Sequence, residues 1–321
     1  MHSFSQLSST FNEYFSKSHF PSTPASLYEP GDYFLAMGGK RVRPVCCLMG
    51  NELFDDIQAS AWEAATAIEL FHNFTLIHDD IMDQAPLRRG FETVHCQYGE
   101  NTALLTGDVM LIRAYEYLNK IEIRFLHPIL ALFNQTATEV CEGQQLDMDF
   151  EKQESVTLEA YLSMIEKKTS VLLAASLTMG AIIGGAGERN QDLIYEFGRK
   201  LGLAFQVQDD YLDAFGDPEK FGKQVGGDIL ANKKTFLLIH SLENAKGEQR
   251  EELLALLQSN PADKVERVLS IYRQCGAADW ALELKNRFFT EALGHLDEIA
   301  VLSPRKSSLK DLALYLVQRE V

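Results

Sequence analysis

The sequence of 321 residues predicts an all-α fold, a single-domain helical bundle of roughly ten or more helices over residues 1–321. Apolar residues recur at helical spacing in many segments, for example at Ile68 and Phe71. No convincing run of alternating β-branched residues lies between turn signals. Prolines are sparse, and none lies between Pro128 and Pro218. These three observations favour helices along the whole chain.

Short segments with turn-forming residues mark where the helices are expected to end. In chain order, the breaks fall at 21–24 (PSTP), 38–40 (GGK), 84–99, 184–190 (GGAGERN), 215–228, 259–263 (SNPAD) and 302–306 (LSPRK). Each contains glycine, proline or both, which end helices or turn the chain. None is long or disordered enough to be an interdomain linker, so a single domain is expected.

The most membrane-like stretch is 169–187, which carries no charged residue. Serines and glycines, among them Ser176, Gly180 and Gly184, dilute its apolar residues, and no second candidate span appears. A membrane span needs about 20 predominantly apolar residues. The stretch is therefore expected to form a buried core helix, and no membrane span is predicted.

Composition excludes several classes of partner. The chain has 30 basic and 46 acidic residues and a formal net charge of −16, so nucleic acid and anionic membranes are not expected to bind it. Its five cysteines are an odd number without a CxxC pair, which argues against a disulfide framework and a zinc site. The first 20 residues lack a charged start followed by an apolar run, so no secretory signal is expected. A reducing cytoplasm fits these features.

The segment LIHDDIMDQAPLRRG, residues 76–90, ends an apolar run with three aspartates: Asp79, Asp80 and Asp83. On a helix, Asp79 and Asp83 are neighbours on one face, where like charges cost roughly 0.2–0.5 kcal/mol per pair. A cation is therefore expected to offset their repulsion.

A second cluster repeats the D-D-x-x-D spacing 130 residues downstream, with Asp209, Asp210 and Asp213 at the end of another apolar run. One such cluster alone is commonly a solvated acidic helix end, but two copies argue against this explanation. Carboxylates without His or Cys suit Mg²⁺, which keeps several waters and binds substrate phosphates. If the two helices face each other across a cavity, they can hold Mg²⁺ ions around one diphosphate.

Basic residues occur beside both clusters, although each one alone is most often surface charge. Lys40 and Arg43 lie three residues apart behind a flexible Gly-Gly. Arg88 and Arg89 follow the first cluster. The further candidates are Lys167, Lys168, Lys223 and Lys233. Together they predict a local basic pocket for a small anion within an acidic protein.

In this order of motifs the sequence resembles the trans-isoprenyl diphosphate synthases, which make farnesyl, geranylgeranyl and longer polyprenyl diphosphates. The matching motifs are GGKRVRP (38–44), ELFHNFTLIHDDIMD (69–83), RRG (88–90), GD (107–108), EGQQLD (142–147), KKTS (167–170), FQVQDDYLDAFGD (205–217), GK (222–223), GGDI (226–229) and NKKT (232–235). The resemblance implies an all-α fold of the isoprenoid synthase type around a deep central cavity, commonly in a homodimer.

The resemblance also implies a role for each matching residue. Asp79, Asp83 and Asp209 match direct Mg²⁺ ligands, with Asp80, Asp210 and Asp213 as supporting carboxylates and three ions per active site. Arg88, Lys168, Lys223 and Lys233 match residues that bind the allylic diphosphate. Lys40, Arg43, His72 and Arg89 match the pocket for isopentenyl diphosphate. A lone His on an apolar helix is more often structural, but His72 lies two turns before Asp79 and matches a diphosphate contact.

The implied reaction is ionisation, condensation and elimination. Lys168 helps to withdraw diphosphate from the allylic substrate, and the Thr169 hydroxyl and Gln206 amide oxygen stabilise the resulting cation. Phe74 and Thr75, five and four residues before Asp79, match positions that limit chain length. One large and one small residue there predict geranylgeranyl diphosphate as the main product, with farnesyl diphosphate as the alternative.

Two rival interpretations remain. A class I terpene cyclase would have a different second metal motif and no use for Lys40 and Arg43. A non-catalytic regulatory subunit of a prenyl synthase would be expected to have lost aspartates, whereas all six are present.

Overall fold

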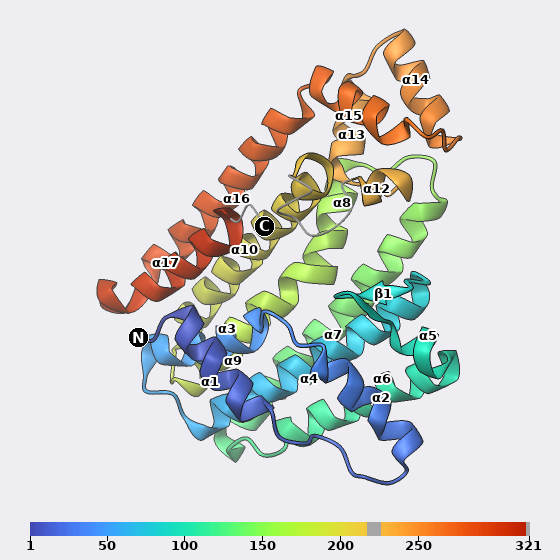
Figure 1. Ribbon diagram of the computed structural model, residues 1–321. Coiled ribbons are helices and arrows are strands. Elements are labelled where there is room, and N and C mark those ends of the chain that lie inside the picture. Colours follow the sequence, from blue (N-terminus) through green and yellow to red (C-terminus); the bar gives the residue numbers. More distant parts are fainter. Residues whose placement is uncertain (217–225, 319–321) are drawn as a thin grey trace. The chain divides into compact units, whose positions relative to one another are not determined.

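The computed structural model describes residues 1–216 and 226–318, which are helical apart from connecting segments and one two-stranded hairpin (Figure 1). The predicted all-α fold is confirmed. The chain folds into two compact units. Unit 1 comprises residues 1–134, 175–194 and 300–308, and unit 2 comprises residues 135–174, 195–299 and 309–321. Lys223, which is predicted to bind the allylic diphosphate, lies outside the described residues.

Unit 1 contains α1 (Phe4–Phe15), α2 (Ala25–Ala36), α3 (Val42–Phe54), α4 (Ala59–Met82), α5 (Val94–Tyr98) and α6 (Glu100–Leu118). It also contains the first part of α7 (Ile123–Lys152), most of α9 (Val171–Ile183), and the starts of α10 (Glu188–Phe215) and α17 (Ser303–Gln318). Helix α4 packs along α6 and α3. A Cβ at Gly180 on α9 would lie 1.8 Å from the Cys47 carbonyl oxygen on α3, so only glycine allows these helices to approach so closely.

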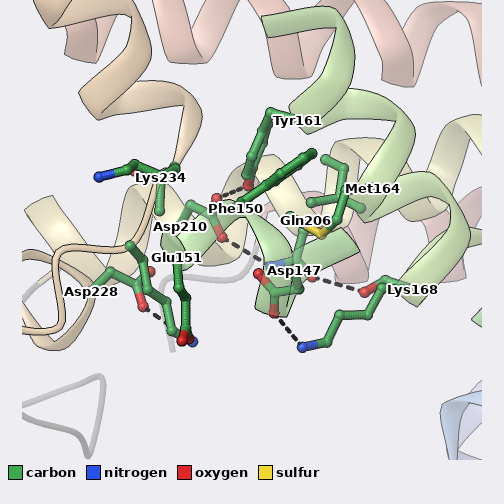
Figure 2. Close-up of a pocket in the computed structure, with 14 residues that line it drawn as sticks. Asp147, Phe150, Glu151, Tyr161, Met164, Lys168, Gln206, Asp210, Asp228 and Lys234 are labelled. Atoms are coloured by element: carbon green, nitrogen blue, oxygen red, sulfur yellow. Dashed lines mark hydrogen bonds and ion pairs between the residues drawn. The ribbon is translucent and has the colours of Figure 1, made fainter. Parts of the chain in front are cut away.

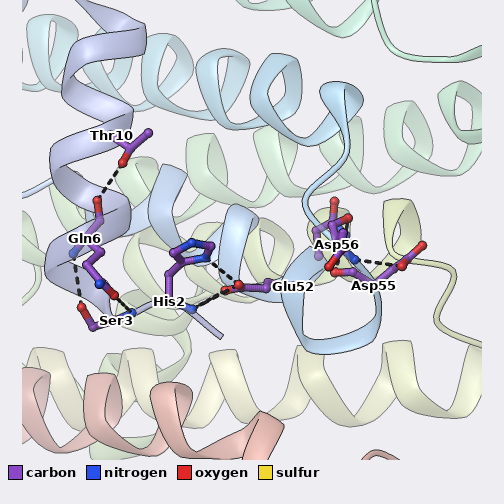
Figure 3. A network of polar contacts seen from close by, with 8 residues as sticks. His2, Ser3, Gln6, Thr10, Glu52, Asp55 and Asp56 are labelled. Carbon is purple, nitrogen blue, oxygen red and sulfur yellow. Dashed lines mark hydrogen bonds and ion pairs between the residues drawn. The ribbon is translucent and has the colours of Figure 1, made fainter.

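The start of α1 is fixed by two sets of hydrogen bonds (Figure 3). Ser3 and Gln6 form a capping box, in which each side chain satisfies a backbone N–H of the other. The His2 backbone N–H donates to Glu52 on α3 at 2.9 Å, and the His2 ring also contacts this carboxylate. At the end of α3, the Asp55 side chain accepts the Asp56 N–H at 2.8 Å in a tight turn.

Unit 2 contains α8 (Leu158–Ile165), the π-helical turn η1 (Glu166–Ser170), α12 (Gly227–Leu230), α13 (Phe236–Asn244), α14 (Glu248–Leu257), α15 (Lys264–Gln274) and α16 (Ala277–Glu298). The remaining parts of α7, α9, α10 and α17 complete it. Two glycines accommodate the wide π-helical turn. A Cβ at Gly143 on α7 would lie 2.3 Å from the Lys168 backbone nitrogen, and one at Gly202 on α10 would lie 2.7 Å from Ser170.

The apolar stretch that includes α9 is a buried helix, as expected, with Ala174, Leu177 and Ile183 almost fully buried. No helix in the described part of the chain is both long and apolar enough to cross a membrane. The predicted break at 84–99 contains a hairpin of β1 (Leu87–Arg88) and β2 (Phe91–Glu92), which the sequence patterns did not indicate.

Candidate active site

The first aspartate motif lies at the end of α4. Its three carboxylates, Asp79, Asp80 and Asp83, differ in how far they are exposed to solvent. Asp83 is the C-cap, and its N–H donates to the Asp79 carbonyl at 2.8 Å. Asp80 is only 1% exposed, whereas Asp79 is partly exposed and Asp83 is exposed. The Asp79 and Asp83 side chains are therefore at least partly open to solvent, although Oδ1 of Asp79 is buried, while Asp80 belongs to the packed interior of unit 1.

The hairpin that follows places a cation beside this motif. Its loop is the dipeptide Arg89-Gly90, with φ of 54° and 83°, as a two-residue type I′ turn requires. The Arg88 Nε lies 2.8 Å from both oxygens of Asp80, and Arg88 Nη2 lies 3.5 Å from Asp79 Oδ2. Burial raises the pKa of Asp80, and Arg88 opposes this shift. A short hairpin thus places one guanidinium against two aspartates.

The GGKRVRP motif forms a basic turn between α2 and α3. Arg41 has a left-handed backbone, with φ of 54°, and its buried guanidinium pairs with Glu69 on α4. Arg43 Nη1 donates to His72 Nε2 at 3.1 Å. Lys40 is exposed, and a Cβ at Gly39 would lie 3.1 Å from the Arg89 guanidinium. The turn therefore brings together, within unit 1, residues that are predicted to bind isopentenyl diphosphate.

The protonation state of His72 follows from its neighbours. Burial and the charge of Arg43 lower its pKa well below the ordinary value, so the ring is neutral near pH 7. Because a guanidinium only donates hydrogen bonds, Nε2 must be the acceptor and Nδ1 must carry the proton. His72 is therefore available as a neutral hydrogen-bond donor.

The two predicted chain-length residues differ in their contacts. The Phe74 ring centroid lies 4.8 Å from that of His78 and 5.6 Å from that of Phe71. His78 is held in turn, because its Nε2 lies 3.0 Å from the Leu104 carbonyl on α6. The Thr75 hydroxyl donates to the His72 carbonyl at 2.8 Å, which folds this small side chain back onto its own helix.

Unit 2 holds a pocket that collects most of the other predicted residues (Figure 2). Its acidic lining residues are Asp147, Glu151, Asp210 and Asp228, its basic ones are Lys168, Lys233 and Lys234, and Thr169 and Gln206 also line it. The π-helical turn presents Lys168, whose Nζ lies 2.6 Å from Asp147 Oδ2. Lys233 Nζ lies 3.9 Å from Asp228 Oδ1. Charges of both signs therefore line a pocket whose basic groups suit an anion.

The second aspartate motif also combines buried and accessible carboxylates. Asp210 accepts hydrogen bonds from the Tyr161 hydroxyl and, at 2.9 Å, from the Gln206 amide N–H. Burial and the nearby Asp228 raise the pKa of Asp210 to about 7. Asp213 Oδ2 accepts the Asp228 N–H at 3.0 Å at the start of α12. Asp209 is partly exposed.

Three residues of this pocket that contact predicted site residues received no role from the sequence. Asp147 and Asp228 end or lie within motifs that the family resemblance had already indicated, EGQQLD and GGDI. Tyr161 had a weaker signal, since it lies seven residues, or two turns, before Lys168. Among the described residues, no three His, Cys, Asp or Glu side chains converge into a ready-made metal site. This all-carboxylate donor set nevertheless suits Mg²⁺, which takes one or two carboxylates and completes its shell with water and phosphate oxygens.

Over nearly its full length, the chain is similar to known prenyl diphosphate synthases. The geranylgeranyl diphosphate synthase of Methanosarcina mazei is 38% identical over 307 residues, which cover 92% of this chain and 91% of that protein. A crystal structure of a geranylgeranyl pyrophosphate synthase is 45% identical, covers 100% of both chains and has a TM-score of 0.95. A polyprenyl synthase from Caulobacter crescentus, solved with calcium and isoprenyl diphosphate, is 25% identical, covers 99% of this chain and 97% of that chain, and has a TM-score of 0.87.

The family model described as polyprenyl synthetase matches residues 24–275, which is most of the sequence. With relatives of this similarity over nearly the full length, the chain belongs to the polyprenyl synthetase family.

Proposed function

We propose that this protein is a Mg²⁺-dependent trans-prenyltransferase that condenses isopentenyl diphosphate head-to-tail with an allylic diphosphate. The allylic substrate is dimethylallyl, geranyl or farnesyl diphosphate, and the main product is geranylgeranyl diphosphate. The pocket of unit 2 carries the proposal, because Lys168, Thr169 and Gln206 line it together with an aspartate of the second motif. Family membership and the names of the relatives support the same activity.

In the proposed reaction, the C1–O bond of the allylic diphosphate breaks and leaves a delocalised carbocation. Arg88, Lys168 and Lys233 bind the departing diphosphate and offset its charge. The carbocation is stabilised by the Thr169 hydroxyl and the Gln206 amide oxygen, which lie 3.4 Å apart. The double bond of isopentenyl diphosphate then attacks C1, and a proton leaves the adduct to the released diphosphate.

The second substrate binds through the basic turn of unit 1. Lys40, Arg43 and Arg89 supply positive charge, and neutral His72 donates from Nδ1 to a diphosphate oxygen. Because the isopentenyl diphosphate keeps its own diphosphate through the reaction, this group needs tight binding without activation.

The proposed cofactor is Mg²⁺, with three ions per active site. Asp79, Asp83 and Asp209 are proposed as direct ligands because their side chains are not fully buried. Asp80, Asp210 and Asp213 support them through the hydrogen bonds and ion pairs described above. When bound, Mg²⁺ would neutralise the diphosphate and make it a better leaving group.

A homodimer is proposed from the surface of α6. Four large apolar residues lie on its exposed face, namely Leu104, Leu105, Ile112 and Tyr115, which are 48%, 55%, 57% and 38% exposed. Such a face is more consistent with a protein contact than with water. The whole chain, 1–321, is proposed to act as one isoprenoid-synthase domain. The five cysteines, all within the described residues, form no disulfide, which fits a cytoplasmic location.

The proposed function is tested by identifying the product of the reaction. Purified protein should be incubated with Mg²⁺, isopentenyl diphosphate and each of the three allylic diphosphates, and the products sized by chromatography. Geranylgeranyl diphosphate from all three primers is expected. Farnesyl diphosphate as the end product would support the alternative chain length, whereas no condensation with any primer would favour a non-catalytic subunit.

A further inference from the structure

Both oxygens of the buried Asp210 carboxylate have donors from within unit 2 (Figure 2). The Tyr161 hydroxyl donates to Oδ2, and the Gln206 Nε2 donates to Oδ1 at 2.9 Å. Asp210 is 7% exposed and Tyr161 is 3% exposed, so water has little access to this contact.

These contacts fix the orientation of the Gln206 side-chain amide. The Gln206 atom that lies against the Asp210 carboxylate is Nε2, at 2.9 Å, so the NH₂ group of the amide faces Asp210. The amide oxygen then points the other way, where the Thr169 hydroxyl donates to it at 3.4 Å. A flipped amide would place its oxygen against Asp210 and its NH₂ group beside Thr169. The two orientations present opposite partial charges to the lining of the pocket.

We propose that Tyr161 is a positioning residue for the prenyl transfer step, which acts through Asp210 to keep the Gln206 amide oxygen directed toward Thr169. The inference rests on the proposed function, in which this oxygen stabilises an allylic cation. A cation gains from the negative end of the amide dipole and is destabilised by the positive end. Without the hydroxyl, the buried carboxylate loses a donor, can rotate, and no longer holds the amide in one orientation.

A purely structural role for Tyr161 predicts different behaviour. Its ring packs against Phe236 with centroids 6.1 Å apart, and Tyr161→Phe retains this packing while removing only the hydroxyl. A structural role would therefore leave the rate of the chemical step unchanged, or lower stability alone. A positioning role would slow that step and would require Gln206 to be present.

The test is a single-turnover measurement with enzyme in excess over geranyl diphosphate and with saturating Mg²⁺ and isopentenyl diphosphate. Tyr161→Phe should lower the rate by about tenfold, the order expected for one hydrogen bond to a charged group. The KM for isopentenyl diphosphate should stay within about twofold of the wild-type value, since the lost contact lies outside that pocket. Tyr195→Phe, the same change at another tyrosine of unit 2, is the matched control and should be close to wild type.

A double-mutant cycle separates the explanations. In a Gln206→Leu background, adding Tyr161→Phe should cause no further slowing, because the amide through which it acts is already absent. A normal rate for folded Tyr161→Phe would overturn the inference, as would an undiminished tenfold effect in the Gln206→Leu background. Wild-type protein that forms no prenyl product would instead overturn the proposed function itself.

Discussion

Removal of the Arg41 guanidinium is expected to destabilise the protein strongly. Arg41 and Glu69 are 7% and 3% exposed, and they form an ion pair between the basic turn and α4. In Arg41→Met, the Glu69 carboxylate keeps the Asn73 amide at 3.0 Å but loses its opposite charge. Leaving one member of a buried pair uncompensated typically costs about 3–5 kcal/mol of unfolding free energy.

The expected loss can be measured by thermal unfolding. One kcal/mol corresponds to roughly 2–4 °C in Tm for a domain of 150–250 residues, so the Tm of Arg41→Met should fall by roughly 6–20 °C. The double variant Arg41→Met/Glu69→Leu replaces the pair with apolar groups and should recover at least half of this loss, because it leaves no buried charge.

A kinetic effect should accompany the loss of stability. Arg41 fixes the turn that carries Lys40 and Arg43, so the KM for isopentenyl diphosphate should rise more than the KM for the allylic substrate. A Tm of Arg41→Met within about 2 °C of wild type would refute the reasoning, since an uncompensated buried carboxylate cannot cost so little. A double variant no more stable than the single one would show that packing, rather than charge, dominates.

Three further sets of substitutions test the site. Asp79→Ala or Asp209→Ala should lower turnover by orders of magnitude with little change in circular dichroism, because the lost interaction stabilises charge in the transition state; near-normal turnover would contradict the metal assignment. Arg43→Ala should raise the KM mainly for isopentenyl diphosphate, and Lys223→Ala mainly for the allylic substrate; equal effects on both substrates would mean that the pockets are misassigned. Phe74→Ala should shift products toward longer chains, because it removes a large ring at a position that matches those limiting chain length, and chromatography of the products measures this. An active variant with unchanged products would remove Phe74 as a determinant.

Phe71→Leu is the matched control for the last change. Phe71 lies on the same helix, but it is 1% exposed and packs against Phe133 with ring centroids 5.1 Å apart. It should lower stability and leave product length unchanged.

Much of the helical architecture could be predicted from periodicity and turn residues, but some breaks could not. The breaks at 38–40 and 259–263 contain glycine or proline and separate helices in the structure, as expected. The break between α3 and α4 at 55–58 has neither. The buried Asn51 side chain on α3 spans it, accepting the Gln58 N–H at 3.0 Å and donating to the Asp56 carbonyl at 3.2 Å. An asparagine within a helical pattern does not by itself reveal such contacts, so residue type alone did not predict this break.

The candidate site divides in the same way. Aspartates, arginines and lysines are charged, so their residue type and spacing were enough to identify them as candidate site residues. Tyr161 could not be found this way, because a tyrosine in an apolar helix is most often core. Its proposed role follows from a hydrogen bond to Asp210, which lies 49 residues away in the chain. The pairing of Lys168 with Asp147 likewise depends on packing of α7 against the π-helical turn at Gly143.

The central claim is Mg²⁺-dependent condensation of two diphosphates, and one measurement tests it most directly. Purified protein is incubated with radiolabelled isopentenyl diphosphate and farnesyl diphosphate, with Mg²⁺ or with EDTA, beside Asp79→Ala as the inactive control. Label should enter geranylgeranyl diphosphate with Mg²⁺, and should remain in the unreacted substrate with EDTA and in the variant. Folded wild-type protein that leaves the label in isopentenyl diphosphate despite Mg²⁺, or that transfers it equally well in EDTA, would contradict the account.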